Sequence, residues 1–169
     1  ELFWPRGKVL GGSSSINAMI HIRGHPADFD GWAAMGNEGW SYDDLLPYFK
    51  RSENNQHRRN EYHGVGGPLN VTDLESPYDL SRVFVDAAAE VGHQRNHDFN
   101  GEQQEGVGLF QVTQKDGQRH SAAAAYLKPA LVERSNLDAR TGAQVTGLRF
   151  DGDTVVGVEY ETDGERRAV

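Results

Sequence analysis

The chain has 169 residues, 37% of them hydrophobic, which is enough for a domain with its own core. Its net charge of -8 excludes nucleic acid and anionic membranes as general partners, because no basic surplus attracts phosphates. Cysteine is absent, so disulfides and thiolate metal sites are excluded; the compartment stays open, with the cytoplasm as our expectation. No apolar run approaches membrane-spanning length.

The first third of the chain predicts three helices after an extended approach at residues 2–12. A short helix is predicted over residues 15–23, following the serines. The second begins at Pro26, with Asp28 in its first turn, and Gly36 can end it in a left-handed cap. The third follows Ser41, which forms a capping-box pattern with Asp44. Its inward-facing residues are Leu45, Leu46 and Phe49, and Pro47 should weaken or kink it.

The middle of the chain predicts one loop, one strand and one longer helix. Residues 51–60 are polar and indicate a surface loop, and residues 68–72 indicate a short strand. The helix is expected to have Ser76 as its N-cap, Pro77 in first position and Gly92 at its end. Its apolar residues keep helical spacing: Leu80, Val83, Phe84, Ala87 and Val91.

The last third changes from helical periodicity to alternation. Residues 109–113 alternate like a strand, and Ser121 is expected to cap an alanine-rich helix to Leu127. Three strands are predicted at residues 144–150, 154–161 and 166 onward. Two turns join them, at 151–153 and 163–164, and both contain Asp-Gly. This order predicts a β-meander.

The stretch from Arg6 to Ile20 contains the most distinctive pattern in the chain, RGKVLGGSSSINAMI. Gly11 and Gly12 lack Cβ atoms, so the backbone there can take positive φ and approach a ligand closely. A run of glycine and serine is also typical of flexible linkers. Here the run passes directly into apolar residues, and the residue types alone leave a ligand-facing loop and a plain structural turn equally open.

Further distinctive elements follow along the chain at characteristic spacing. They include the segment 39–49 (GWSYDDLLPYF), Tyr62-His63-Gly64, Gly67-Pro68-Leu69 and the segment 98–101 (DFNG). Together with residues 6–52, these elements resemble the GMC family, the glucose-methanol-choline flavin oxidoreductases. The resemblance extends over nearly the whole chain. One departure is His21, where the family usually has a large aromatic residue or alanine.

The resemblance implies an α+β fold and an internal fragment of a GMC flavoprotein. It assigns residues 1–52 to the flavin-proximal part of the FAD domain and residues 53–136 to a partial substrate domain with connecting helices. Residues 137–169 would be a β-meander that belongs to the FAD domain.

The resemblance also implies FAD as the cofactor. Carried over position by position, the cofactor-binding residues are Gly12, Ser13, Asn17, Ala18, Met19 and Ile20, and Val145 matches a position whose backbone meets the adenine. Some family members tether FAD through a histidine just before the asparagine. Here that position is Ile16, which has no nucleophilic nitrogen, so we expect non-covalent FAD.

We expect no catalytic residue within the chain. Alcohol oxidation needs a base for the hydroxyl proton, yet none of the seven histidines matches the base of the family, which lies near the family's C-terminus. His93 and His97 have metal-like spacing but follow Gly92, so we expect no metal site. The dinucleotide fingerprint Gly-x-Gly-x-x-Gly is also missing.

The expected function is FAD-dependent oxidation of a CH–OH group, with choline or another primary alcohol giving the aldehyde and hydride passing to flavin N5. The partner is therefore a small alcohol. The alternatives are a non-catalytic fragment or binding module, and a relative of the hydroxynitrile lyases. We expect the isolated chain to be inactive and to retain little or no FAD.

Overall fold

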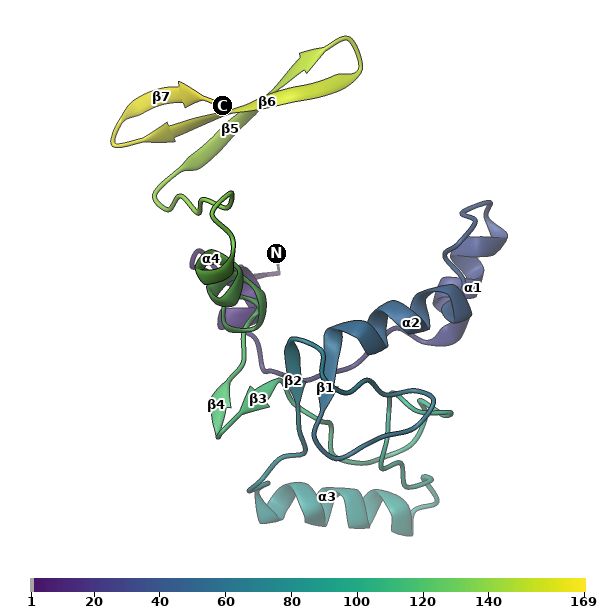
Figure 1. Ribbon diagram of the computed structural model, residues 1–169. Coiled ribbons are helices and arrows are strands. Elements are labelled where there is room, and N and C mark those ends of the chain that lie inside the picture. The colour runs from purple at the N-terminus through teal and green to yellow at the C-terminus, as the bar shows by residue number, and fades with distance from the viewer. Residues whose placement is uncertain (1) are drawn as a thin grey trace. The chain divides into compact units, whose positions relative to one another are not determined.

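The structure is a computed structural model that describes residues 2–169. It divides into two compact units, one ending at Pro129 and the other covering Ala130–Val169. Within the described residues it is mixed α+β, as predicted, and none of the helices is both long and apolar enough to cross a bilayer. The elements of the first unit are η1 (Gly12–Ser15), α1 (Pro26–Ala34), α2 (Tyr42–Ser52), β1 (Glu53–Asn55), β2 (Leu69–Val71), α3 (Asp79–Glu90), β3 (Gln114–Lys115), β4 (Gln118–Arg119) and the π-helix η2 (Ala123–Leu127) (Figure 1).

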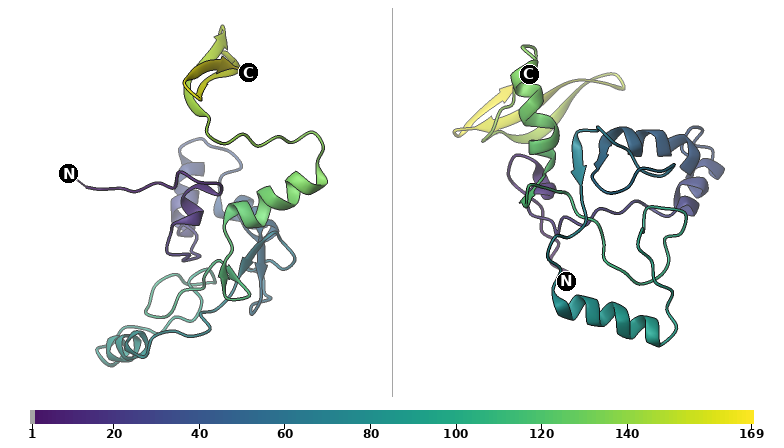
Figure 2. Two further views of the ribbon diagram at one scale, coloured as in Figure 1. Left: turned by 90° about the vertical axis from the view of Figure 1, so that its left-hand side faces the viewer. Right: turned by 60° about the horizontal axis from the view of Figure 1, so that its bottom comes forward.

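Helices α1 and α2 confirm two of the predictions and pack against each other (Figure 2). Ser41 and Asp44 form the predicted capping box, and α2 continues through Pro47 to Ser52. The ring of Phe29 lies 5.5 Å from the ring of Phe49, which joins the two helices. Phe49, which the sequence predicts to face inward, therefore contacts α1.

The second unit contains the predicted β-meander. Helix α4 (Lys128–Glu133) crosses the division between the units, and three antiparallel strands follow, β5 (Gln144–Asp151), β6 (Thr154–Thr162) and β7 (Glu165–Ala168). Both predicted Asp-Gly turns join them, with Gly152 and Gly164 in the left-handed region at φ 57° and 78°. Tyr160 is the buried apolar residue of this unit.

The helix predicted over residues 15–23 is wrong. The structure has only the four-residue 3-10 helix η1, and the chain is then extended, with Ile20 bridged to Val112. The side chain of Asn17 accepts a hydrogen bond from the Met19 N–H at 3.0 Å, which takes that donor away from a helix. Met19 itself is left-handed at φ 64°, which ends any helical path.

The surface loop predicted over residues 51–60 is also wrong at its beginning. Residues 51 and 52 complete α2, and β1 follows, paired in parallel with β2 at the position of the predicted strand. Glu53 and Asn55 are buried despite their polarity. The polar composition indicated that these residues are exposed to solvent. In the structure, partners distant in the sequence supply the hydrogen bonds of both side chains.

Three smaller differences concern element ends. The N-cap of α3 is Tyr78 without a side-chain cap, not Ser76, although Gly92 follows the helix at φ 101° as expected. Residues 109–113 form isolated bridges at Val112 instead of a strand. Ser121 Oγ accepts a bond from the Ala124 N–H at 3.4 Å, but the helix after it is π-type rather than α.

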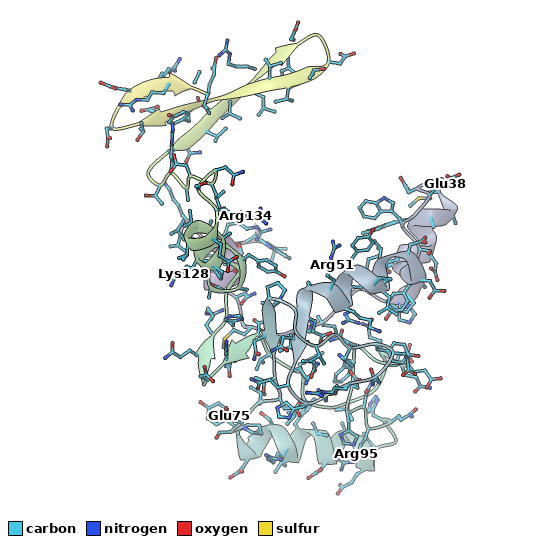
Figure 3. The ribbon with its side chains drawn as sticks, viewed as in Figure 1. Glu38, Arg51, Glu75, Arg95, Lys128 and Arg134 are labelled. Atoms are coloured by element: carbon cyan, nitrogen blue, oxygen red, sulfur yellow. The ribbon has the colours of Figure 1, made fainter. Side chains whose placement is uncertain are left out.

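Polar groups make up much of the interior of the first unit. Of the buried residues in the described chain, six are apolar and eight are polar or charged. Side chains crowd the region around β1 and β2 in Figure 3. The polar buried residues are Arg23, Glu53, Asn55, His63, Asn70, Thr72, Asn100 and Gln111.

The close approach of Gly64 to α2 yields a test of this packing. A Cβ on Gly64 would overlap the carbonyl oxygen of Lys50, a backbone atom that cannot step aside. We expect Gly64→Ala to lower the free energy of unfolding by roughly 3 kcal/mol or more, measured by urea denaturation of the purified protein. The control is Gly31→Ala in α1, where an added Cβ meets nothing within 4 Å. That change should raise stability by about 0.5–1 kcal/mol; equal effects of the two substitutions contradict the packing.

Candidate functional site

The backbone bends sharply at Gly11 and Gly12, with φ of 90° and 55°. A Cβ on Gly11 would meet Ser15 Oγ at 2.5 Å, so this glycine permits close packing inside the bend. A Cβ on Gly12 would meet nothing within 4 Å. Gly12 therefore presents bare backbone on an open side, as a close-lying ligand requires.

The serine hydroxyls hold the bend together instead of capping a long helix. Ser13 Oγ accepts a bond from the Gly7 N–H at 3.3 Å, and Ser15 Oγ donates to the Leu10 carbonyl at 2.8 Å. Ser14 Oγ accepts from the Ala122 N–H at 2.9 Å, which ties the bend to the start of the alanine-rich helix. The shape of the bend is thus fixed from both sides.

Residues 17–19 form a tight turn directly after the bend. Met19 holds its left-handed conformation although such a backbone costs a non-glycine residue about 1–2 kcal/mol. Two hydrogen bonds compensate: Asn17 Oδ1 accepts from the Met19 N–H at 3.0 Å, and the Met19 carbonyl accepts from the Thr113 N–H at 2.8 Å. The turn is a stable, shaped part of the surface.

The surface around this turn combines one polar amide with apolar groups. Asn17 and Ala18 are exposed, and Ile16 and Ile20 expose 49% and 48% of their surface. This surface therefore offers apolar contact, hydrogen-bonding groups and bare backbone side by side. This segment carries six of the residues predicted to bind the cofactor, namely Gly12, Ser13, Asn17, Ala18, Met19 and Ile20.

Behind this turn, the extended chain leads into a buried ion pair. Arg23 Nη2 donates to Glu53 Oε2 at 2.7 Å, and both side chains are almost fully buried, at 4% and 0% exposure. Arg23 Nη1 also donates to the Tyr62 carbonyl at 2.7 Å. Because a buried charge is costly unless paired and hydrogen-bonded, this geometry is what allows the pair to exist.

His63 connects the same carboxylate to a second one. Its Nδ1 lies 3.0 Å from Glu53 Oε1 and its Nε2 lies 2.9 Å from Asp98 Oδ2. Burial lowers the pKa of His63, but the hydrogen bonds and charges of the two carboxylates outweigh it and raise the pKa above 6.5. Both ring nitrogens can then donate, one to each carboxylate.

Glu53 is held ionised by its neighbours. Burial acts to raise its pKa, but hydrogen bonds from His63, the Gly64 N–H and Asn55, together with the charge of Arg23, lower the pKa from 4.5 to about 2. The pKa of Asp98 is lowered as well, since the bond from His63 overcomes its burial. This group of side chains, Arg23, Glu53, His63 and Asp98, is called the buried charge cluster below.

His21, the departure noted in the sequence, lies at the edge of the buried charge cluster. Its Nε2 is buried, 3.7 Å from Glu53 Oε1, and has no hydrogen-bond partner among residues 2–169. Burial lowers the pKa of His21, with the charges of Arg23 and His63 acting in the same direction against that of Glu53. His21 therefore faces the interior instead of the surface at Asn17.

Two amides fasten the segment after the turn to the buried charge cluster. Asn100 accepts from the Arg23 N–H at 2.8 Å and donates to the His21 carbonyl at 3.0 Å. The backbone carbonyl of Gln111 accepts a hydrogen bond from the His21 N–H at 2.9 Å, and the side-chain oxygen of Gln111 accepts one from Asn55 Nδ2. The exposed turn at residues 17–20 is thus continuous with a rigid interior.

The remaining predicted residue, Val145, belongs to the second unit. It lies on β5 opposite Tyr160 and is 53% exposed. It lines a hollow of about 400 Å³ together with Val158 and Tyr160. A half-open strand position beside an aromatic ring is compatible with its predicted role, which stays a prediction.

Sequence reasoning missed the buried charge cluster and Arg119. Glu53 fell within a segment interpreted as a loop, and nothing in the sequence near His63 indicated its two carboxylate partners. Arg119 belongs to no pattern in the sequence, yet its Nη1 lies 2.7 Å from Asn17 Oδ1. The only available signal was Tyr62-His63-Gly64, which resemblance alone singled out. Among residues 2–169, no three His, Asp or Glu side chains are arranged to hold a metal ion.

The comparisons place this chain in a family. The family model for GMC oxidoreductase matches residues 1–169, so the chain belongs to the GMC oxidoreductase family. It is 49% identical to an alcohol dehydrogenase [acceptor] of Pseudomonas putida over 95% of the chain, and 45% identical to the mitochondrial choline dehydrogenase of Mus musculus over 98%. The chain spans 29% and 28% of the length of these curated relatives.

Solved structures agree with this assignment. Pyridoxine 4-oxidase from Mesorbium loti matches with a TM-score of 0.90 and 35% identity, covering 98% of this chain and 33% of that one. An FAD-dependent oxidoreductase from Chaetomium thermophilum matches with a TM-score of 0.88 and 27% identity, covering 97% of this chain and 31% of that one. The fold of the described residues is therefore a GMC fold.

The buried charge cluster predicts a large cost for neutralising Glu53. We expect Glu53→Gln to lower the free energy of unfolding at pH 7 by about 3–5 kcal/mol, because Arg23 and His63 lose their buried counterion. Urea denaturation measures the change. The control is Glu75→Gln, an exposed residue near one end of α3 (Figure 3), which should change stability by less than about 0.5 kcal/mol.

The pH dependence of the free energy of unfolding, compared between wild type and Glu53→Gln, tests the lowered pKa of Glu53. Because the pKa of Glu53 in the folded state, about 2, lies below its usual value of 4.5, the stabilisation by Glu53 is complete above pH 4.5 and is lost as pH falls toward 2. The shift corresponds to about 3 kcal/mol. Unfolding curves of wild type and Glu53→Gln should therefore converge below pH 4.5; a constant difference down to about pH 3 contradicts a depressed pKa.

Proposed function

We propose that this chain forms part of an FAD-dependent oxidoreductase that converts a primary alcohol, choline being one candidate, to the aldehyde. The observation that supports the proposal most strongly is the bend at Gly12, which is left-handed and open beside the exposed amide of Asn17. Membership of the GMC family and the similarity to an FAD-dependent oxidoreductase of Chaetomium thermophilum both favour FAD as the ligand of that open surface.

FAD, when bound, supplies the acceptor for the hydride that leaves the alcohol carbon. The residues of this chain bind and orient it. The bare backbone at Gly12 permits close approach, Ala18 keeps the ring face clear, and Asn17 offers a hydrogen bond. We assign Ser13, Met19 and Ile20 to the same surface and Val145 to the adenine end.

Large apolar surfaces support a role within a longer polypeptide. Leu80 and Phe84 on α3 expose 77% and 67% of their surface. Neighbouring apolar side chains that are this exposed are typical of a surface that another part of a protein covers. The curated relatives are more than three times as long as the matched segment. We propose that residues 1–52 and 137–169 belong to the FAD domain of such a protein and residues 53–136 to its substrate domain.

The exposed position of Ala18 gives a direct test of FAD binding. In the complete gene product we expect Ala18→Leu to raise the dissociation constant of FAD at least about 10-fold, or roughly 1.4 kcal/mol, because the larger side chain enters the space of the ring. Quenching of flavin fluorescence measures binding. The control, Ala34→Leu, is exposed at the end of α1 and should leave FAD affinity unchanged.

Two outcomes of that titration contradict the proposal. Equal affinities of the Ala18→Leu and Ala34→Leu proteins place FAD elsewhere. A complete gene product that binds no FAD removes the flavoenzyme interpretation and favours a binding module. In a separate activity assay, FAD binding without oxidation of any alcohol favours a lyase-type relative. The isolated 169-residue chain is expected to retain little FAD.

The side chain of Ile16 predicts that the flavin is not covalently attached. Isoleucine has no nucleophilic atom, and its side chain is half exposed beside the bend. After acid precipitation of the holoprotein, we expect the yellow flavin in the supernatant. Flavin that stays in the pellet after denaturation contradicts non-covalent binding, and a variant with Ile16→His is the comparison in which a tether becomes chemically possible.

A further inference from the structure

Arg119 contacts the Asn17 turn from a distant part of the sequence. Its Nη1 donates to Asn17 Oδ1 at 2.7 Å and to the Ser14 carbonyl at 3.0 Å, across 102 and 105 residues. Arg119 is half-buried at the end of β4. Because a hydrogen bond from a charged donor is stronger than one between neutral groups, this contact is a substantial restraint on the Asn17 amide.

The two donors fix which way the amide faces. Asn17 Oδ1 receives hydrogen bonds from the Met19 N–H and from Arg119, and both of these groups can only donate. A flipped amide would place its own NH2 group against two donors. Nδ2 has no partner among residues 2–169, and Asn17 is exposed, so its N–H groups are available to a ligand.

The short hairpin of β3 and β4 brings this restraint into position. Gln114 pairs with Arg119, and the turn between the strands has Asp116 and Gly117 left-handed at φ 52° and 69°. The residue before β3, Thr113, donates its N–H to the Met19 carbonyl at 2.8 Å. One hairpin therefore holds both ends of the turn, Met19 through Thr113 and Asn17 through Arg119.

We infer that Arg119 is a positioning residue, whose guanidinium holds the Asn17 amide with its NH2 group presented as a hydrogen-bond donor to the flavin of FAD. The inference rests on the proposed function, since it assumes that the Asn17 surface binds FAD. Arg119 acts through Asn17 and does not need to touch the cofactor. A donor locked in place in this way spares the ligand the cost of ordering it.

The test is a double-mutant cycle on the complete gene product, with the dissociation constant of FAD as the readout. We expect Arg119→Met and Asn17→Ala each to raise that constant by about 5- to 10-fold, the loss of one oriented hydrogen bond. The double variant should bind no more weakly than Asn17→Ala alone. Arg119→Lys, which can still donate to Asn17, should remain within about 2-fold of wild type.

Matched controls separate positioning from folding and from charge. Arg82→Met removes an exposed arginine on α3 and should leave FAD affinity unchanged. Melting temperatures of the apoproteins identify any variant that fails to fold. If Arg119→Met fails to fold, the FAD affinity of Arg119→Lys is compared with that of wild type instead.

The inference is overturned if Arg119→Met weakens FAD binding equally in the Asn17→Ala background, since Arg119 then acts directly or through Ser14. It is also overturned if Arg119→Met changes nothing while the wild type binds FAD. If the wild type binds no FAD, the proposed function has failed and the positioning role fails with it.

Discussion

Glu53 has no contact with solvent, so its negative charge must be balanced by groups within the chain. Arg23, His63 and the Gly64 N–H supply that balance, and they come from two separate stretches of sequence, one at Arg23 and one at His63-Gly64. A buried ion pair adds little net stability, but removing one partner is expensive. The buried charge cluster therefore fixes which segments lie together in the first unit more than it adds to stability.

That constraint reaches the surface through the chain between Asn17 and Arg23. Asn100 and Gln111 hold the backbone at His21 and Arg23, and the β3–β4 hairpin holds Met19 and Asn17. The exposed turn is restrained at both ends while its outer side stays open. This combination favours the proposed role in binding FAD, because a site that is already ordered loses little entropy on binding.

The sequence predicted the elements whose causes are local. The capping box at Ser41 and the Asp-Gly turns of the meander each depend on neighbouring residues, and both are present. The helix expected after Ser15 failed because Asn17 and Thr113 capture the backbone of Met19. Glu53 was interpreted as solvent-exposed because its partners lie 10 to 30 residues away. The glycine bend was predicted, but the role of Arg119 required the fold.

The open side of Gly12 is the face that we propose to meet the flavin ring. An experimental structure of the complete gene product with FAD bound tests it directly. We predict the isoalloxazine against the backbone of Gly12, within hydrogen-bond distance of the Asn17 NH2 group. An isoalloxazine bound elsewhere, with the outer side of Gly12 covered by protein side chains, contradicts the account.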